Sequence, residues 1–274
     1  MTEFSAWVGR TEERRDRLDP SRSNVLLAAI GQPETRAEGD PLPPLHHWLH
    51  FWEAKTPDQT GVDGHAKRGG FLPPIALPRR MWAGGRLIFR RPLALGADVR
   101  RLSTIDRIEE KTGRSGTLIF VTVRHEIFGD GELAIEEEQD LVYREPSAAA
   151  PAPAVSGDGE PEAADSSIDP DSVLLFRYSA LTMNSHRIHY DGRYAMEEEG
   201  YEGLVVHGPL QATLLAGLAE RRLGGPLTAF RYRGVSPAVA GHRLSLHAEP
   251  GEQGLDLWAS QRGTKTMTAH AGAR

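Results

Sequence analysis

The chain has 274 residues, of which 39% are hydrophobic and 26% are charged, a composition typical of a globular protein with a buried core. Its net charge of −6 argues against nucleic acid and anionic membranes as partners, because both are bound through clustered basic residues. The absence of cysteine excludes disulfides, thiolate nucleophiles and cysteine-based zinc sites. The N-terminus has no signal-peptide pattern and no apolar run approaches about 20 residues, so we expect a cytoplasmic protein.

The chain before residue 86 predicts little regular structure. Residues 19–21, Asp-Pro-Ser, are typical of a helix start, and we expect them to open a helix over Val25–Ile30. Residues 55–70 are loop-like. Three histidines stand within an aromatic block, where we interpret them as packing and lining residues: His46, His47 and His50.

From residue 86 onward the pattern changes to β-rich stretches separated by turn residues. Proline and glycine signals lie at residues 92–96, 113–116 and 129–131. The pattern predicts an antiparallel meander. Its four strands are expected at Arg86–Arg91, Val99–Glu110, Thr117–Phe128 and Ala134–Arg144.

Residues 146–167 have a different composition, of alanine, proline, glycine, serine and acids with almost no bulky apolar side chain. Such a segment cannot bury enough surface to order itself, so we predict a flexible linker. It divides the chain into an N-terminal domain over residues 1–145 and a C-terminal domain over residues 168–274.

The second half repeats the order of the first. We expect a short strand over Leu174–Ala180 and a helix within Leu204–Leu223, which begins near Pro209 and ends at a double glycine. Strands are expected to follow at Thr228–Val235, His242–Glu249, Leu255–Gln261 and Lys265–Ala271. The matching order, with a shared proline-to-glycine spacing after a double glycine, indicates an α+β fold made of two copies of one unit.

The densest group of polar and titratable side chains precedes this second helix. Asn184, His186, His189 and Asp191 lie within eight residues. A helix opening at residues 207–209, His-Gly-Pro, would direct free N–H groups and a partial positive charge toward whatever lies before it. A histidine that carries protons beside an anion site suggests chemistry on a carbonyl compound.

A helix followed by an antiparallel meander, occurring twice, resembles a double hot-dog fold. The second copy is similar to the MaoC-like, (R)-specific enoyl-CoA hydratases and 3-hydroxyacyl-thioester dehydratases. The motif of these families consists of an aromatic residue, then Ser/Thr-Gly, then Asp-x-Asn-Pro-aliphatic-His. In this chain the aromatic residue corresponds to Tyr178, the Ser/Thr-Gly part to residues 181–183, and the last part to residues 184–189, Asn-Ser-His-Arg-Ile-His. Their His-Gly helix opening corresponds to His207 and Gly208. Residues 7–9, 68–74 and 79–84 extend the resemblance to a narrower group, the itaconyl-CoA and mesaconyl-C4-CoA hydratases and the mitochondrial type 2 thioester dehydratases.

The resemblance implies a cofactor-free hydro-lyase acting on an enoyl-CoA thioester. The C-terminal domain would carry the chemistry, and the N-terminal domain would be a non-catalytic wall. His189 would act as general base and acid, Asn184 would hold the attacking water, and Gly208 would donate its N–H to the thioester oxygen. A turn role for Asn184 and a helix-start role for Gly208 are the alternatives. Most family members have an aspartate where Asn184 stands. An amide cannot act as a general base, so we expect the catalytic roles to be distributed differently among the residues of this site.

The remaining candidate residues would bind substrate. Itaconyl-CoA and mesaconyl-C4-CoA carry a free carboxylate, which an arginine can bind in a bidentate manner. The candidates are Arg68, Arg79, Arg80 and Arg187, together with His186, Asp191 and His207.

Three alternatives remain open at this level. The spacing of His186, His189 and Asp191 permits a metal, but we expect none, because a thioester is already electrophilic enough for an enolate-like route. A 3-hydroxyacyl-ACP dehydratase and a non-catalytic acyl-CoA-binding protein are the other functions considered. Homo-oligomer formation is left open.

Overall fold

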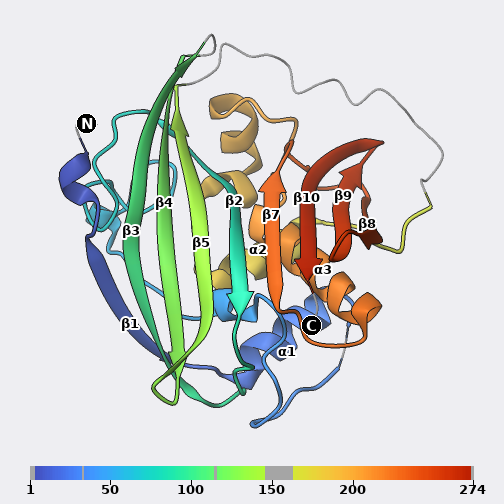
Figure 1. The fold of residues 1–274 in the computed structure, drawn as a ribbon. Coiled ribbons are helices and arrows are strands. Elements are labelled where there is room, and N and C mark those ends of the chain that lie inside the picture. Colours follow the sequence, from blue (N-terminus) through green and yellow to red (C-terminus); the bar gives the residue numbers. More distant parts are fainter. Residues whose placement is uncertain (1–3, 33, 114–115, 146–162, 273–274) are drawn as a thin grey trace.

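The computed structural model describes residues 4–32, 34–113, 116–145 and 163–272 (Figure 1). The strands are β1 (Thr11–Arg17), β2 (Arg79–Phe89), β3 (Asp98–Gly113), β4 (Gly116–Gly129), β5 (Glu132–Arg144), β6 (Ser166–Ile168), β7 (Ala229–Gly234), β8 (Leu244–Gly251), β9 (Gly254–Gln261) and β10 (Thr264–Gly272). The α-helices are α1 (Pro20–Ala29), α2 (Ser172–Thr182) and α3 (Gly208–Leu223). Short helical turns are η1 (Ser5–Trp7), η2 (His46–Leu49), η3 (Pro57–Gln59), η4 (Arg187–His189) and η5 (Tyr194–Glu198).

The ten strands formed by the described residues make a single antiparallel sheet in the order β1-β3-β4-β5-β2-β7-β10-β9-β8-β6. Counted inward from its outer edge, each half contributes its first, third, fourth, fifth and second strand. The two halves meet where β2 pairs with β7. This symmetric order confirms the predicted α+β class and the double hot-dog arrangement.

The junction between the halves depends on two glycines of β2. A Cβ on Gly85 would lie 2.3 Å from the hydroxyl of Tyr232 and 2.5 Å from the carbonyl of Glu138. A Cβ on Gly84 would lie 2.7 Å from the carbonyl of Tyr232. Beside them the ring of Trp82 stacks on Tyr232, with centroids 4.4 Å apart. The small residues therefore allow an aromatic layer to form across the seam.

Helix α3 is the central helix of the C-terminal half and packs against β7, β8, β9 and β10 (Figure 1). It begins at Gly208 with Pro209 in the first turn and ends before Gly224, whose φ is 69°. This confirms the predicted helix. It is buried on most sides, as expected for a helix that the sheet wraps around. None of the helices formed by the described residues combines the length and apolar character that a membrane span requires.

The prediction of a strand over Leu174–Ala180 is wrong, because these residues lie in α2. The side chain of Asp171 accepts the N–H of Leu174 at 2.8 Å and caps the helix. Leu174, Leu175 and Tyr178 are buried, whereas Phe176 is 64% exposed, and this is helical spacing. A short apolar run does not distinguish a strand from a buried helix, and the cap was the signal that could have done so.

The N-terminal half confirms some expected elements and adds one. Asp19 caps α1 by accepting the N–H of Ser21 at 2.9 Å, which confirms the predicted helix start although the helix begins at Pro20. The strand expected at Arg86–Arg91 is the end of β2. Strand β1 was not predicted, because its charged sequence lacks the apolar alternation of a strand; it lies at the sheet edge and pairs with β3.

The predicted linker falls largely outside the described residues, at 146–162. Strand β6 begins at Ser166, inside the predicted linker range, and pairs with β8. Asp165 precedes it and accepts the N–H of Ala248 at 2.7 Å.

Candidate active site

The polar motif of the second half begins where α2 ends. Met183 has a left-handed conformation (φ 52°) that terminates the helix. The N–H of Asn184 then donates to the carbonyl of Ser179 at 2.8 Å, and the side-chain oxygen of Asn184 accepts the N–H of His186 at 3.0 Å. Because Oδ1 is used by the backbone, Nδ2 is the end of the Asn184 amide that remains to bind a ligand.

His189 follows in η4 and is held in one orientation. Its Nδ1 lies 2.7 Å from the carbonyl oxygen of Val205, so Nδ1 carries the proton and Nε2 has the free lone pair. The side chain is 7% exposed. Burial lowers the pKa of His189 to about 3, so the imidazole is neutral at physiological pH and able to accept a proton.

His207 connects His189 to the two helices of the site. The His189 and His207 rings stack with centroids 3.7 Å apart. His207 is fully buried, and its Nε2 lies 2.9 Å from the hydroxyl of Ser179 on α2. Burial holds the pKa of His207 well below its usual range. This side chain immediately precedes α3 and therefore fixes the start of α3 relative to α2.

The start of α3 is packed against an aromatic wall from the other half of the molecule. A Cβ on Gly208 would lie 2.8 Å from the ring of Trp82, so a glycine is required for this approach. Pro209 lines the neighbouring cavity. The first N–H groups of an α-helix have no partner within the helix and carry partial positive charge, so they form a site where an oxyanion can be stabilised.

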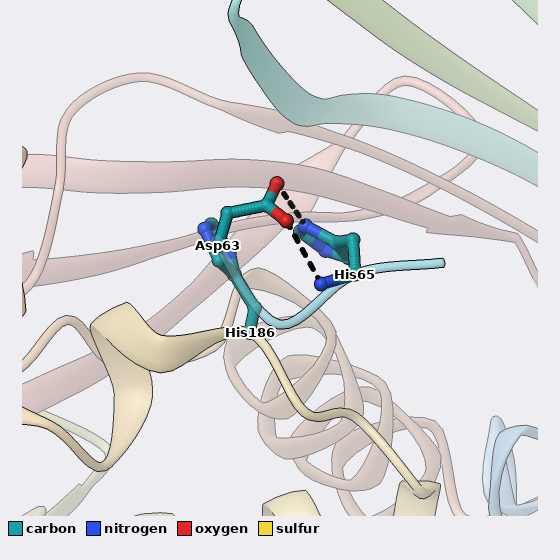
Figure 2. Close-up of side chains that lie close together, drawn as sticks. All are labelled: Asp63, His65 and His186. Atoms are coloured by element: carbon teal, nitrogen blue, oxygen red, sulfur yellow. Dashed lines mark hydrogen bonds and ion pairs between the residues drawn. The ribbon is translucent and has the colours of Figure 1, made fainter. Parts of the chain in front are cut away.

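The N-terminal half contributes a second polar group, which the sequence did not reveal. Figure 2 shows Asp63 bound to His65, with the His186 ring beside them. The Asp63 carboxylate accepts hydrogen bonds from the His65 backbone N–H at 3.0 Å and from its Nδ1 at 3.1 Å. The His65 and His186 rings lie 4.1 Å apart. These residues lay in a stretch interpreted as loop, and an Asp-Gly-His sequence alone does not predict which surface the loop will contact.

The charges of this cluster follow from burial and from its neighbours. Burial opposes ionisation of Asp63, but its hydrogen bonds with His65 outweigh this and hold the carboxyl pKa below its usual range. Burial and the nearby positive charge of Arg80 lower the pKa of His65 to about 4. Burial and His65 lower the pKa of His186 to about 3. The cluster therefore contains one carboxylate and two neutral imidazoles at neutral pH.

The loop that carries Asp63 is bound directly to the motif. The N–H of Arg187 donates to the carbonyl of Asp63 at 2.9 Å, and the Ser185 hydroxyl donates to the carbonyl of Gly64. Gly64 has φ +89°, and a Cβ there would lie 1.8 Å from the carbonyl oxygen of Ser185. The N-terminal half therefore positions the turn that carries the candidate catalytic residues.

Asp63, His65 and His186 are also the group in the described part of the chain that could hold a metal ion. One ligand atom from each lies within 4.8 Å of the others. Both Asp63 oxygens already accept hydrogen bonds from His65, and the charge of Arg80 disfavours a cation. The spacing considered for His186, His189 and Asp191 does not form such a group: the two rings are 5.6 Å apart and perpendicular, and Asp191 is bound to Arg187.

A cavity of about 740 Å³ lies between the two halves, and His65, Asn184 and Pro209 are among the residues that line it. His186, His189, His207 and Gly208 are not among the lining residues, but their sequence neighbours Ser185, Tyr190 and Pro209 are, as is Ser179, which is hydrogen-bonded to His207. The N-terminal half lines the cavity with Trp48, Phe51, Trp52, His65, Trp82, Arg101 and Gln139, among others. The C-terminal half contributes Phe176, Tyr178, Ser179, Met183, Asn184 and Pro209.

The candidate arginines occupy four different environments. Arg187 forms an ion pair with Asp191 at 2.7 Å and donates to the carbonyl of Val62 at 3.1 Å. Arg68 donates to three backbone carbonyls, those of Ile75, Leu77 and Pro78.

The other two candidates lie at the start of β2. Arg79 lies 3.4 Å from the carboxylate of Glu199 and donates to its backbone carbonyl at 3.0 Å. Arg80 is paired in the sheet opposite Tyr143 and is close enough to His65 and His186 to lower the pKa of both. None of the four candidate arginines is among the residues that line the cavity.

The chain is similar to proteins of known activity over nearly its whole length. The family described as hydroxyacyl-thioester dehydratase type 2 matches residues 45–240. A mesaconyl-C(4)-CoA hydratase of Chloroflexus aurantiacus is 46% identical over 259 residues, which cover 94% of this chain and 92% of the relative.

Solved structures agree with the fold. A MaoC-like dehydratase from Phytophthora capsici superposes with a TM-score of 0.73 at 14% identity, covering 100% of this chain and 98% of the other. A Mycobacterium tuberculosis protein with a double hotdog fold superposes with a TM-score of 0.57 at 13% identity, covering 96% and 95%.

Proposed function

Because this chain belongs to the hydroxyacyl-thioester dehydratase type 2 family and is therefore a hydro-lyase, we propose that it reversibly adds water to the double bond of a short dicarboxylic enoyl-CoA thioester. The observation that carries the proposal is His189: a buried, neutral imidazole that is oriented by Val205 and stacked on His207 at the start of α3, whose Pro209 lines an acyl-sized cavity. The substrate class follows the 46% identity to a mesaconyl-C(4)-CoA hydratase.

In the proposed reaction, Nδ2 of Asn184 holds a water molecule whose proton passes to Nε2 of His189. The water oxygen bonds to the β-carbon, and the electron pair of the double bond moves onto the thioester, whose oxygen becomes negative. The N–H of Gly208 at the positive end of α3 stabilises this oxyanion. The imidazolium of His189 then gives its proton to the α-carbon, so the histidine returns to its starting state and no further reactant is needed.

This scheme accounts for the asparagine at position 184. The buried, neutral His189 serves as base and acid in turn, so a second titrating carboxylate at position 184 is not required. A carboxylate there would instead favour the charged imidazolium and raise the pKa of His189.

The second candidate function is the reverse reaction, in which a 3-hydroxyacyl thioester of CoA or of a carrier protein is dehydrated. It is favoured by the family match over residues 45–240. His186 and His207 would orient the groups that contact substrate. We also propose a cytoplasmic location and no nucleic acid or membrane partner, as the sequence predicts. A homo-oligomer is compatible with this proposal.

A panel of enoyl-CoAs tests the function. Loss of the ultraviolet absorbance of the conjugated thioester is measured with mesaconyl-C4-CoA, itaconyl-CoA and crotonyl-CoA. We expect hydration with a higher kcat/KM for the dicarboxylic thioesters. Equal use of all three would favour the acyl-chain dehydratase, and binding without turnover would favour a non-catalytic acyl-CoA-binding protein.

A further inference from the structure

One arginine that the sequence did not single out lies in the wall of the cavity. Arg101 on β3 lines the cavity from the N-terminal half. Its Nε is buried and has no hydrogen-bond acceptor among the described residues, and it forms no ion pair with any of them. A guanidinium has five N–H donors, so a partly buried Arg101 whose Nε is unpaired and which lines a cavity can receive an acceptor from a ligand in that cavity.

The neighbours of Arg101 hold it in place without neutralising it. Its guanidinium lies 4.8 Å from the ring centre of Phe51, which also lines the cavity. Phe51 has φ 61°, an unfavourable conformation for a bulky residue, and its N–H donates to the carboxylate of Asp16 at 2.7 Å. Strained backbone of this kind is kept where the surrounding structure requires it, often at ligand-binding positions.

A buried carboxylate balances the charge of Arg101 from a distance. Glu137 is 2% exposed, and its field acts on Arg101 without a direct ion pair. Its oxygens are already used by Nε2 of His47 at 3.0 Å, Nε1 of Trp48 at 2.8 Å and the amide of Gln139 at 2.7 Å. Glu137 therefore lowers the cost of burying Arg101 and leaves its N–H groups free.

The other arginines near this wall contrast with Arg101. Arg14, which pairs with Arg101 across the sheet, is bound to Glu12 at 2.8 Å and Glu53 at 2.7 Å. Arg22 is bound to Asp16 at 3.0 Å. Arg100, the preceding residue, lies 3.3 Å from Glu13 and does not line this cavity.

We propose that Arg101 binds the free carboxylate of the acyl group and thereby selects dicarboxylic over monocarboxylic thioesters. This rests on the proposed function. Nε and one Nη can bind the two carboxylate oxygens side by side, as in other arginine–carboxylate pairs. The alternative anion is a phosphate of coenzyme A. A single, largely buried guanidinium among aromatic side chains matches one carboxylate better than a hydrated diphosphate.

Binding of unreactive thioesters tests the proposal without catalysis. Succinyl-CoA carries the second carboxylate and butyryl-CoA lacks it, and neither has a double bond to hydrate. We expect Arg101→Gln to weaken succinyl-CoA binding, measured by calorimetry, by about 10²–10³-fold, the cost of leaving a buried charge unpaired. Butyryl-CoA binding should change by less than about threefold. Arg100→Gln, one residue away, is the matched control and should change neither.

The same variants separate this proposal from the proposed function. If wild type prefers succinyl-CoA and Arg101→Gln keeps that preference, Arg101 does not bind the carboxylate, whatever the activity assay shows. If Arg101→Gln weakens both ligands equally, and pantetheine thioesters lacking the phosphates are unaffected, the arginine binds coenzyme A and the proposal is overturned. Arg101→Lys keeps the positive charge but cannot form the two parallel hydrogen bonds of a guanidinium. Circular dichroism verifies that both variants are folded. An unchanged succinyl-CoA affinity in folded Arg101→Lys would also contradict a bidentate contact.

Discussion

At the scale of single residues, the environment of each group explains its proposed role better than its identity does. His186, His189 and His207 have the same side chain, but only His189 has Nδ1 bound to a backbone carbonyl, which sets its tautomer. The sequence motif was sufficient to predict Asn184, His189 and Gly208 as candidates. It could not predict Arg101, because an arginine in a strand pattern gives no indication of whether its guanidinium will be paired or left facing a cavity.

The first prediction concerns the proton carrier. His189→Gln should lower kcat by roughly 10²–10⁴-fold, the usual contribution of general acid–base catalysis, with little change in Tm. Steady-state hydration and thermal unfolding measure the two effects. His270→Ala, which removes a histidine paired with Asp256 away from the cavity, is the control. A His189→Gln enzyme of wild-type activity would exclude the assigned role.

The second prediction concerns position 184 and pH. Because burial lowers the pKa of His189 to about 3, its neutral, active form persists, and kcat/KM of the wild type should stay level as pH falls from 8 to about 5. Asn184→Ala should lose activity because it removes the amide that holds water. Asn184→Asp should keep part of the activity. It should also move the acidic side of the pH–rate profile to higher pH, since a carboxylate stabilises the imidazolium form of His189. A fully active Asn184→Ala would show that the water is held elsewhere.

At the scale of elements, the site depends on a loop that contains no regular structure. Residues 60–66 of the N-terminal half bind the turn after α2, so the C-terminal motif is not positioned by its own half alone. Strand patterns and the α3 helix were predictable because their apolar periodicity and proline and glycine boundaries are local signals. The contact of this loop with Ser185 and Arg187 is not local, and α2 was mistaken for a strand because its apolar run is short.

Gly64 provides the third prediction. Gly64→Ala places a Cβ against the carbonyl of Ser185 in a backbone conformation that disfavours a side chain, so the loop must shift away from the motif. We expect kcat/KM to fall by at least about tenfold and the melting temperature to drop, because strain of this kind costs about 1–3 kcal/mol. Gly70→Ala, where a Cβ meets no atom within 4 Å, should behave as wild type. Equal behaviour of the two variants would argue against a positioning role for the loop.

At the scale of the whole molecule, duplication and divergence are both visible. The mirrored strand order agrees with the sequence-based prediction of two copies of one unit, which rested on the repeated order of elements. The copies then differ in use: the C-terminal half carries His189 and α3, while the N-terminal half supplies His65, Trp82 and Arg101 to the cavity. The expectation of a non-catalytic N-terminal wall stays a prediction, and the part of that wall that lines the cavity combines aromatic with polar and charged side chains.

The fourth prediction is a loss of stability in mild acid. His46, His50 and His125 are buried and neutral, and burial lowers their pKa values to about 3, about 4 and about 4. The unfolded chain binds these protons near pH 6.5, so below that pH it takes up more protons than the folded protein. Each such histidine should reduce the free energy of unfolding by about 1.4 kcal/mol per pH unit there. Urea unfolding at pH 7.5, 6.5 and 5.5 measures this, and a constant value would contradict the buried neutral state.

The central claim is that the buried neutral His189, whose neighbour Tyr190 lines a cavity between the two halves, hydrates a dicarboxylic enoyl thioester. Its most direct test is the kcat/KM for mesaconyl-C4-CoA, measured by loss of enoyl-thioester absorbance for wild type and His189→Gln in parallel. The account predicts rapid hydration by wild type, a loss of about 10²–10⁴-fold in the variant, and slower use of crotonyl-CoA by wild type. Absence of hydration by the folded wild type, or an equal rate in the variant, would contradict it.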